Sequence, residues 1–396
     1  MYKSYEKTIW SLIILAYFLA FIGPFTSNAI LAIMAVLEDT FSVSVDMIAL
    51  SITLYLVPFS VVQLFSGAIS DKIGYFKGIL IGSSIFAFSS FYVAISPNIY
   101  HFILARFLQG IGAAFLTPLS MALLGDLSPP ESRGKIMSGY AVAATAGISS
   151  SPIIAGYLAI FNWRFFFYFV AIGTFVFLTI LFSKRSTLIR YSPASKSEDI
   201  IENIKIALSD KRLIVLGLFG FLIFFSRISF YTYLSKTLSS PPYYFDPVII
   251  GSYISAAGFA GLLSSPIAGF LIDNLGKRFT TLIASTLLCI TFSLYFLIDW
   301  IAVLYILIII MGLSITTLFI TFSTIVVDIN PRLRSTYSSV YNFLRFIGYS
   351  LGPTLTYPIY AQFGFYGILT VVLVSTFIIL LSLMTRFMAQ FEKSKM

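Results

Sequence analysis

The stretch GAISDKIG, residues 67–74, lies between two long apolar segments and is matched by GFLIDNLG, residues 269–276. Both have the pattern Gly-x-x-x-Asp-x-x-Gly, and each glycine and aspartate recurs 202 positions later. Basic residues follow both copies, Lys77 after the first and Lys277 and Arg278 after the second. One half of the chain is therefore predicted to be a duplicate of the other.

Further landmarks support the duplication. Four pairs recur at an offset of 201 or 202, namely Gly147 with Gly348, Pro152 with Pro353, Asp126 with Asp328, and Arg133 with Arg334. Parallel duplication of a membrane domain is the construction of many secondary transporters, whose substrate site lies between the halves near the bilayer midplane. Glycine and proline inside long apolar stretches are expected to bend helices around such a cavity. The candidate bending residues are Gly147, Pro152, Gly348, Gly352 and Pro353.

The composition excludes a water-soluble protein. Apolar residues make up 58% of the 396 residues and charged residues only 10%, and the mean hydropathy is +0.95. A soluble domain of this size would need roughly a quarter charged residues to cover its surface. Cys289 is the single cysteine, and the sequence has no phosphate-binding loop, no metal-ligand cluster and no nucleophile beside a base. We expect no enzyme activity, no cofactor and no metal.

Twelve apolar stretches are long enough to cross a bilayer, which takes roughly 20 residues at 1.5 Å each. They are placed at 8–36, 46–66, 76–96, 100–123, 134–160, 164–183, 213–236, 247–272, 278–298, 300–325, 335–361 and 365–386. The predicted fold is an all-α membrane protein with twelve transmembrane helices in two pseudo-symmetric six-helix bundles. The bundles are expected at 1–183 and 213–396, joined by a cytoplasmic linker at 184–212.

The distribution of charge predicts the orientation. Nearly all basic residues fall in the termini, the linker and alternate loops, and the other side keeps only Arg164 and Lys236. By the positive-inside rule, both termini and the linker are cytoplasmic in a cell membrane. The net charge of +9 is then explained by an anionic leaflet, not by nucleic acid.

The linker is expected to contain a helix of its own. Ser195 and Glu198 have the spacing of a capping box, and Ile200, Ile201, Ile204 and Leu208 follow at helical spacing. This pattern predicts an amphipathic helix that lies on the inner leaflet and tethers the two halves.

The duplicated loop resembles a motif of the major facilitator superfamily, and the resemblance extends over essentially the full chain. Residues 67–77 resemble the family's loop between helices 2 and 3, in which an acidic residue, basic residues and glycines lie at cytoplasmic helix ends. Lys72 stands where Arg is commoner, and Tyr75 stands where a basic residue is usual. The resemblance therefore implies a charge network that is weaker in this chain.

Two other stretches resemble one group within that superfamily, the drug:proton antiporters. Leu104-x-Arg106-x-x-Gln109-Gly110 is similar to their helix-4 signature. Residues 147–156 resemble their helix-5 signature, with serine and alanine at two of its glycine positions. The resemblance implies twelve helices and proton-coupled export of amphipathic or drug-like compounds.

Charged residues at the cytoplasmic helix ends form the candidate gate. Asp71 can face the N-terminal end of a helix near Ser335, where unpaired N–H groups and the helix dipole favour an anion. Asp126 is expected to pair with Lys77 or Arg133, and Asp328 with Arg278 or Arg334. The full candidate set is Gly67, Asp71, Lys72, Gly74, Lys77, Asp126, Arg133, Asp273, Gly276, Arg278, Asp328 and Arg334.

Three arginines fall inside predicted membrane helices. An arginine that faced lipid at the centre of a helix would cost about 2.5–3.5 kcal/mol, so these should face a cavity, pair with polar groups, or both. The alternative is that each ties its own helix to neighbouring carbonyls. With their polar neighbours they give the candidate substrate-binding set Arg106, Gln109, Arg227, Tyr231, Tyr341, Asn342 and Arg345.

The acidic residues are placed differently. All sixteen fall in termini, loops or helix ends, whereas proton-driven transporters usually carry a membrane-embedded carboxylate or histidine. Two hypotheses follow for a monomeric secondary transporter that works by alternating access. The first is a proton-coupled exporter of amphipathic or drug-like small molecules. The second is an organic-anion symporter or facilitator that uses the buried arginines.

Overall fold

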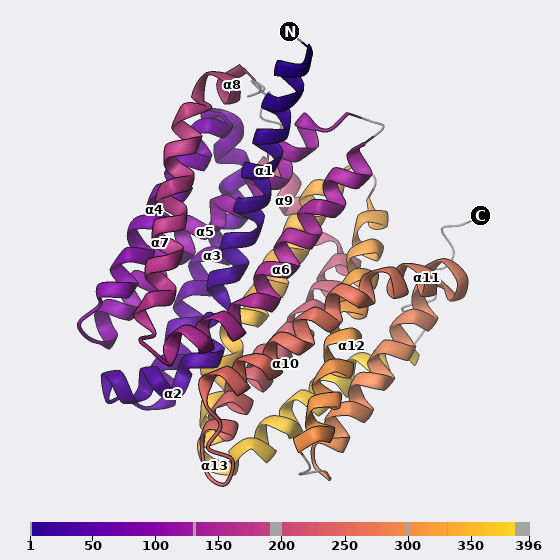
Figure 1. Ribbon diagram of the computed structural model, residues 1–396. Helices are drawn as coiled ribbons and strands as arrows, with labels where there is room; N and C mark the ends of the chain where they lie inside the picture. Colours follow the sequence, from indigo (N-terminus) through magenta and orange to yellow (C-terminus); the bar gives the residue numbers. More distant parts are fainter. Residues whose placement is uncertain (1, 130–131, 191–199, 298–300, 331, 385–396) are drawn as a thin grey trace. The chain divides into compact units, whose positions relative to one another are not determined.

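The structure is a computed structural model that describes residues 2–129, 132–190, 200–297, 301–330 and 332–384 (Figure 1). Within these residues the regular structure is entirely helical. The chain divides into two compact units, residues 1–198 and 199–396. The boundary between them falls inside the segment expected to be a linker, and the capping box expected at Ser195 and Glu198 lies outside the described residues.

The first unit is built from long apolar helices. They are α1 (Tyr2–Ser27), α2 (Ala29–Phe41), α3 (Val45–Ile73), α4 (Tyr75–Ile95), α5 (Ile99–Leu127), α6 (Arg133–Ala159), α7 (Arg164–Ser183) and the short α8 (Arg185–Arg190). The first expected crossing is realised by α1 and α2 together, with Asn28 between them. The helix α2 ends where Ser42 adopts a left-handed conformation, with φ of 51°.

The second unit has fewer but longer helices. They are α9 (Ile200–Ser209), α10 (Lys211–Ser239), α11 (Pro247–Leu294), α12 (Ile301–Ile329) and α13 (Arg334–Met384). The helices α11 and α13 span 48 and 51 residues, more than twice the length of one crossing. Each contains one glycine with non-helical backbone angles, Gly276 in α11 and Gly364 in α13. Each of these helices is therefore two crossings joined at a glycine.

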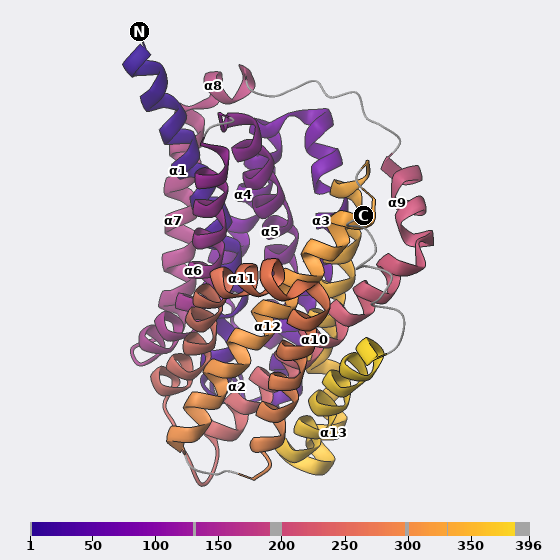
Figure 2. The same ribbon diagram turned by 90° about the vertical axis from the view of Figure 1, so that its right-hand side faces the viewer.

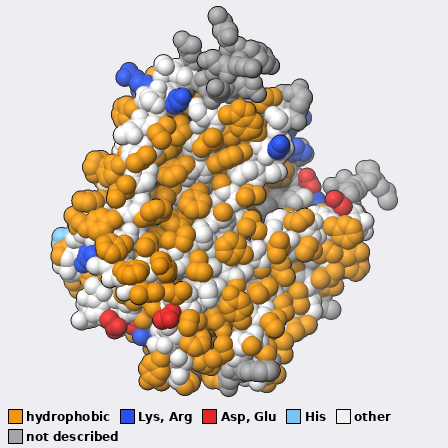
Figure 3. Space-filling model, in the orientation of Figure 1, with side chains coloured by type: hydrophobic (Ala, Val, Ile, Leu, Met, Phe, Trp, Pro, Cys, Tyr) orange, Lys and Arg blue, Asp and Glu red, His pale blue; other side chains and the backbone are white. Residues whose placement is uncertain are grey.

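The described residues contain ten helices that are long and apolar enough to cross a membrane. Counting α11 and α13 as two crossings each gives the twelve expected from the sequence. Hydrophobic side chains cover most of the face drawn in Figure 3, and the few charged ones lie toward its edges. This surface suits a hydrocarbon environment and confirms the predicted fold class of an all-α membrane protein.

Polar side chains cap the start of two of these helices. The Asn98 side chain accepts hydrogen bonds of 3.1 Å from the backbone N–H groups of Tyr100 and His101 at the start of α5. Asp246 accepts one of 2.8 Å from the Ile249 N–H at the start of α11. These side chains satisfy backbone donors that have no partner inside the helix.

The two units share an unusual backbone conformation at the duplicated loop. Gly74 has φ of 85° and ψ of 155°, and Gly276, 202 positions later, has φ of 82° and ψ of 163°. This region is essentially restricted to glycine because a Cβ atom would clash with the backbone. The last glycine of the motif therefore makes the same turn in both units.

Helix contacts are duplicated as well. A Cβ atom added at Gly110 of α5 would lie 2.0 Å from the Tyr55 carbonyl oxygen of α3. At Gly312 of α12 it would lie 2.2 Å from the Ala257 carbonyl oxygen of α11. Both partners are again 202 positions apart. Glycine thus lets the backbones of two membrane helices touch, once in each unit.

A second helix pair repeats in the same manner. Added Cβ atoms at Gly147 and Gly348 would each lie 2.4 Å from a phenylalanine carbonyl oxygen, that of Phe21 on α1 and that of Phe221 on α10. The helices α1 and α6 lie side by side (Figures 1 and 2), and the equivalent helices α10 and α13 pack against each other in the second unit.

Gly147 and Gly348 thus allow the backbone of a neighbouring helix to approach closely. Gly352 has it too, because its added Cβ atom would lie 2.5 Å from the Ile228 side chain. Pro152 and Pro353 lie inside α6 and α13. Helix bending at these five positions stays a prediction.

We expect Gly110→Ala and Gly312→Ala each to destabilise the protein by about 1–3 kcal/mol, the usual cost of overpacking. The reason is that the new methyl group would meet a backbone carbonyl, which cannot rotate away. The melting temperature in detergent, followed by the loss of the monodisperse gel-filtration peak, measures the effect.

Gly125→Ala is the matched control for these variants. It lies on α5 with open space around its added Cβ atom, and it should melt at or above the temperature of the wild type. Equal melting temperatures for Gly110→Ala, Gly312→Ala and the control would contradict the close contact.

Candidate functional site

The second unit gathers two arginines and several aromatic rings at membrane depth. Arg227 lies on α10, roughly 22 Å along the helix from Arg212, and Arg345 lies on α13, roughly 16 Å from Arg334, at 1.5 Å per residue. Both arginines are half-buried. We call them, with the rings around them, the arginine–aromatic cluster, which consists of Phe224, Arg227, Tyr231, Phe319, Arg345, Phe346 and Tyr349.

Three phenylalanine rings surround Arg345. Its guanidinium carbon lies 4.5 Å from the centroid of Phe224, 4.5 Å from that of Phe319 and 4.3 Å from that of Phe346. These rings come from α10, α12 and α13 respectively. A cation within about 6 Å of a ring face is attracted by the ring quadrupole, so the three helices together stabilise this charge.

Arg227 lies close to three rings of the same cluster. Its guanidinium carbon is 5.8 Å from the centroid of Phe224, 5.5 Å from that of Tyr231 and 6.0 Å from that of Tyr349. The ring of Phe224 is therefore shared by both arginines, and it packs edge-on against Tyr349 at 5.9 Å. Local spacing explains the arrangement, because Phe224 and Tyr231 lie one turn to either side of Arg227 on α10.

Several polar atoms near the cluster have no hydrogen-bond partner among the described residues. They include Nε of Arg227 and the hydroxyl groups of Ser226, Ser229, Thr232 and Tyr341. Tyr341 lies one turn before Arg345 on α13, and its ring packs against Gly220 of α10. A buried polar group without a partner costs about 1–3 kcal/mol, so these groups are suited to bind water or a polar ligand.

Neutralising carboxylates are distant from this region. The acidic residues of the neighbouring helices lie near the helix ends, as Asp210, Asp246 and Asp328 do. Arg227 forms no ion pair with an Asp or Glu of the described chain. Half-buried cations among aromatic faces favour a ligand that carries negative charge and an apolar or aromatic body.

Arg106 has a different environment, enclosed in the first unit. It is fully buried and lies over the ring of Tyr55, 4.1 Å from the centroid. Its Nη1 donates to Oε1 of Gln109 at 2.6 Å and to the carbonyl oxygen of Thr26 at 3.4 Å. Gln109 in turn donates to the Ser90 hydroxyl at 2.8 Å. This network joins α5 to α1, α3 and α4, whereas Nε and Nη2 of Arg106 have no hydrogen-bond partner among the described residues.

The structure thus separates the predicted substrate-binding residues. It brings Arg227, Tyr231 and Arg345 together in one cluster and places Tyr341 and the half-buried Asn342 on the same helix as Arg345. It places Arg106 and Gln109 in the other unit. A role in substrate binding stays a prediction for all seven.

Sequence reasoning missed four rings of the cluster. They are Phe224, Phe319, Phe346 and Tyr349. Helical spacing from an arginine could have indicated Phe224 and Tyr349, which lie three residues before Arg227 and four after Arg345. Phe319 comes from a separate helix, so no local pattern indicates it.

The candidate gate includes two equivalent contacts with different chemistry. In the second unit, Nζ of Lys277 forms an ion pair of 2.5 Å with Asp328. In the first unit, the Tyr75 hydroxyl donates to Asp126 at 2.7 Å. Tyr75 corresponds to Lys277, and Asp126 to Asp328, at the offset of 202. One copy of the contact is therefore ionic and the other is a hydrogen bond from a neutral group.

The expected partners of these aspartates were wrong. Asp126 pairs with neither Lys77 nor Arg133 among the described contacts, because Tyr75 occupies the place beside it. Arg133 donates instead to the carbonyl oxygen of Gly125 at 2.7 Å. Asp328 pairs with Lys277 and not with Arg278 or Arg334, the two partners expected for it.

The other gate residues are only partly described. The surroundings of Gly67 and the side chains of Asp71 and Lys72 are not described. In the second copy, Asp273 is exposed and Arg278 is half-buried, and Arg334 is exposed at the start of α13. Their role in gating stays a prediction.

Comparisons with known proteins agree with this architecture. The family model described as Major Facilitator Superfamily matches residues 13–353. An uncharacterized MFS-type transporter of Bacillus subtilis, YceJ, is 26% identical over 352 residues, which cover 85% of this chain and 86% of that protein. Multidrug resistance protein 2 of the same organism is 23% identical over 283 residues, covering 69% of each chain.

One solved structure shows a similar fold. It is a crystal structure of a bacterial homolog to the human lysosomal transporter Spinster, with a TM-score of 0.77 and 16% identity. The likeness covers 96% of this chain and 97% of that one.

We expect Lys277→Gln and Tyr75→Phe to differ in their response to salt. Loss of the partly exposed ion pair should cost about 0.2–1 kcal/mol at low salt and less at about 0.5 M NaCl, where charges are screened. Loss of the Tyr75 hydroxyl should cost about 1.5–3 kcal/mol, the usual value for a hydrogen bond to a charged group, with little salt dependence. Melting temperatures at two salt concentrations measure both effects. The same salt dependence in both variants would show that the two contacts do not differ as described.

Proposed function

We propose that this chain, which belongs to the Major Facilitator Superfamily, is a secondary transporter of small amphipathic organic anions. The observation that carries this proposal is the arginine–aromatic cluster. It offers two cationic groups and several aromatic faces within one unit. Such a site is complementary to a carboxylate, sulfonate or phosphate ester attached to an apolar or aromatic body.

An anionic substrate would be energetically more favourable at the cluster than a cationic one. A guanidinium at membrane depth is costly unless it is paired, and an anionic substrate would supply an ion-pair partner for Arg227 each time it binds. A cationic substrate would add a further positive charge beside Arg227 and Arg345, with acidic residues only near the helix ends. The aromatic rings would then contact the apolar part of the substrate.

Transport would follow the alternating access of the family. The two bundles would expose a central site first to one side of the membrane and then to the other. The duplicated loops would act as the latch on the cytoplasmic side, with Asp71 facing the N-terminal end of a helix. The positive-inside rule supports cytoplasmic termini, and we propose a monomer in the cell membrane.

Proton-coupled export of amphipathic or drug-like compounds is the second candidate. It is supported by the likeness to Multidrug resistance protein 2 and by the signature around Arg106 and Gln109. Such an antiporter needs a group that gains and loses a proton during the cycle. The candidate carboxylates for this role are Glu38 and Asp39 near the end of α2 and Asp46 in the first turn of α3.

We expect Arg227→Gln and Arg345→Gln to weaken anion binding. Each should lose about 1.5–3 kcal/mol, or roughly 10- to 150-fold in affinity, because a charged hydrogen bond is replaced by a neutral one. The measurement is uptake of an aryl carboxylate into proteoliposomes, with and without an imposed pH gradient. Arg332→Gln, an exposed arginine before α13, is the matched control and should transport like the wild type.

The outcomes separate the two candidates. Anion flux that is lost in both cluster variants and kept in the control supports the anion carrier. Gradient-driven transport of cations that is unaffected by Arg227→Gln and Arg345→Gln would eliminate it and favour the drug exporter.

We expect Asp71→Asn to slow turnover while substrate affinity changes by only a few-fold. The reason is that Asp71 would stabilise one conformation from a position far from the substrate. Single-turnover flux compared with equilibrium binding in detergent separates these two quantities. Normal flux from a normally expressed variant would rule out the latch.

A further inference from the structure

The short helix α9 (Ile200–Ser209) exposes large apolar side chains although it is not one of the membrane-spanning helices. Ile201 is 64% exposed and Leu208 is 45% exposed. The hydrocarbon core accounts for exposed apolar residues on the long helices, but it does not account for these. Exposed apolar residues that gather on one face of a helix indicate a surface that binds a partner or a membrane.

One face of α9 is already used inside the second unit. Ala207 is fully buried, and α9 packs against α10 and α13. Ile201, Lys205 and Leu208 follow one another at helical spacings of four and three residues, so they form a stripe along the helix. All three are exposed. We call this the α9 stripe, and it has an apolar residue at each end and a cation in the middle.

The connection to α10 fixes where this stripe lies. Only Asp210 separates α9 from Lys211, the first residue of a membrane span. Asp210 accepts hydrogen bonds from the backbone N–H of Arg212 at 2.9 Å and from the Tyr337 hydroxyl of α13 at 3.1 Å. This corner holds α9 beside the end of a membrane crossing, which is the level of the lipid headgroups.

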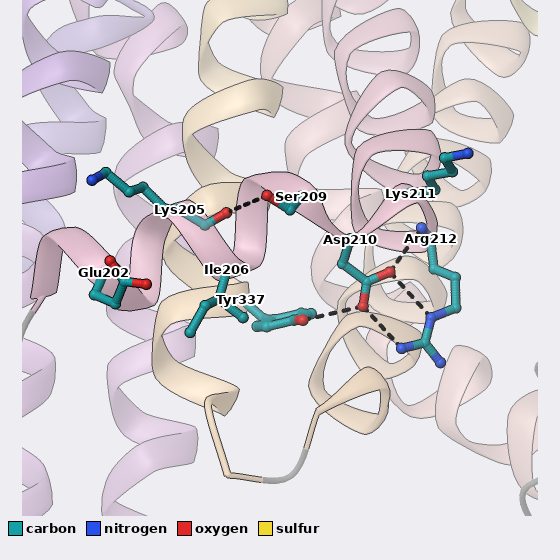
Figure 4. Close-up of a pocket in the computed structure, with 8 residues that line it drawn as sticks. All are labelled: Glu202, Lys205, Ile206, Ser209, Asp210, Lys211, Arg212 and Tyr337. Atoms are coloured by element: carbon teal, nitrogen blue, oxygen red, sulfur yellow. Dashed lines mark hydrogen bonds and ion pairs between the residues drawn. The ribbon is translucent and has the colours of Figure 1, made fainter.

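The negative charge of Asp210, between α9 and α10, is partly neutralised by the neighbouring Arg212. Arg212 donates from Nη2 to Asp210 at 2.9 Å, and these hydrogen bonds hold the pKa of Asp210 below its usual value, so it stays ionised at neutral pH. Lys205 and Lys211 are directed away from this pair (Figure 4). They border an open hollow of about 610 Å³ between α9, α10 and α13. These two exposed lysines are thus available to an external anion.

We propose that the α9 stripe docks on an anionic membrane leaflet, with Ile201 and Leu208 at the acyl boundary and Lys205 and Lys211 at lipid phosphates. The apolar ends of the stripe would be buried among lipid chains. Lys205 would extend its ammonium group to the headgroups, as long cationic side chains do at interfaces. The partner is identified by its chemistry, since an apolar surface with adjacent cations complements an anionic lipid surface. This proposal is independent of the transported substrate.

Spin-label accessibility in the full-length chain tests this docking. The protein carrying Cys289→Ser is reconstituted into phosphatidylcholine alone or into mixtures with phosphatidylglycerol. A nitroxide is attached after Ile201→Cys or, as the control one residue away on the polar side, after Glu202→Cys. Oxygen, which partitions into lipid, should relax the label at 201, whereas a water-soluble nickel chelate should relax the label at 202.

The lipid dependence gives a second readout. Phosphatidylglycerol should increase the oxygen accessibility at 201. Adding Lys205→Gln should raise the fraction of phosphatidylglycerol needed for half of that increase by about fivefold, the factor for about 1 kcal/mol per lysine. Lys205→Arg should behave like the parent because it keeps the charge.

Three results would overturn the proposal. The nickel chelate could reach 201 as readily as 202, which would mean a solvated face. Neither relaxing agent could reach 201, which would mean that protein covers it. The oxygen accessibility of the label at 201 could also be unchanged by phosphatidylglycerol and by Lys205→Gln. That result would exclude recognition of anionic lipid.

Discussion

The absence of water in the hydrocarbon core is the constraint on which this architecture depends. Because lipid offers no hydrogen-bond partner, each crossing must satisfy its backbone within its own helix, and helices then associate by close packing. Gly110 and Gly312 bring backbone against backbone at equivalent places, with Tyr55 and Ala257 as their partners. The duplication predicted from the sequence is therefore repeated in the contacts between helices.

The same absence of water means that an arginine at membrane depth needs partners from the protein or from a ligand. The first unit encloses Arg106 completely and binds its Nη1 to Gln109 and Thr26. The second unit leaves Arg227 and Arg345 half-buried among rings. The two units thus place positive charge in different ways, one enclosed between its own helices and the other on a surface that an anion can complement. This difference locates the proposed specificity in the second unit.

Much of the fold could be predicted from the sequence, because hydrophobic length and the 202-residue repeat are properties of the chain itself. The apolar stretches, the glycine loop and the fold class were predicted in this way. The partners of Asp126 and Asp328 could not be, since several basic residues lie within reach of each aspartate and only packing selects among them. Phe319 was missed because its place beside Arg345 depends on how α12 packs against α13.

Ligand-induced stabilisation of the purified protein tests the central claim most directly. Aryl carboxylates and sulfonates would be compared with quaternary ammonium compounds of matched size, by melting temperature in detergent. A ligand at 100 times its Kd stabilises the folded state by about 2.7 kcal/mol, so binding should give a clear shift. The account predicts that the anions raise the melting temperature and that the cations do not. Stabilisation by the cations alone would contradict it.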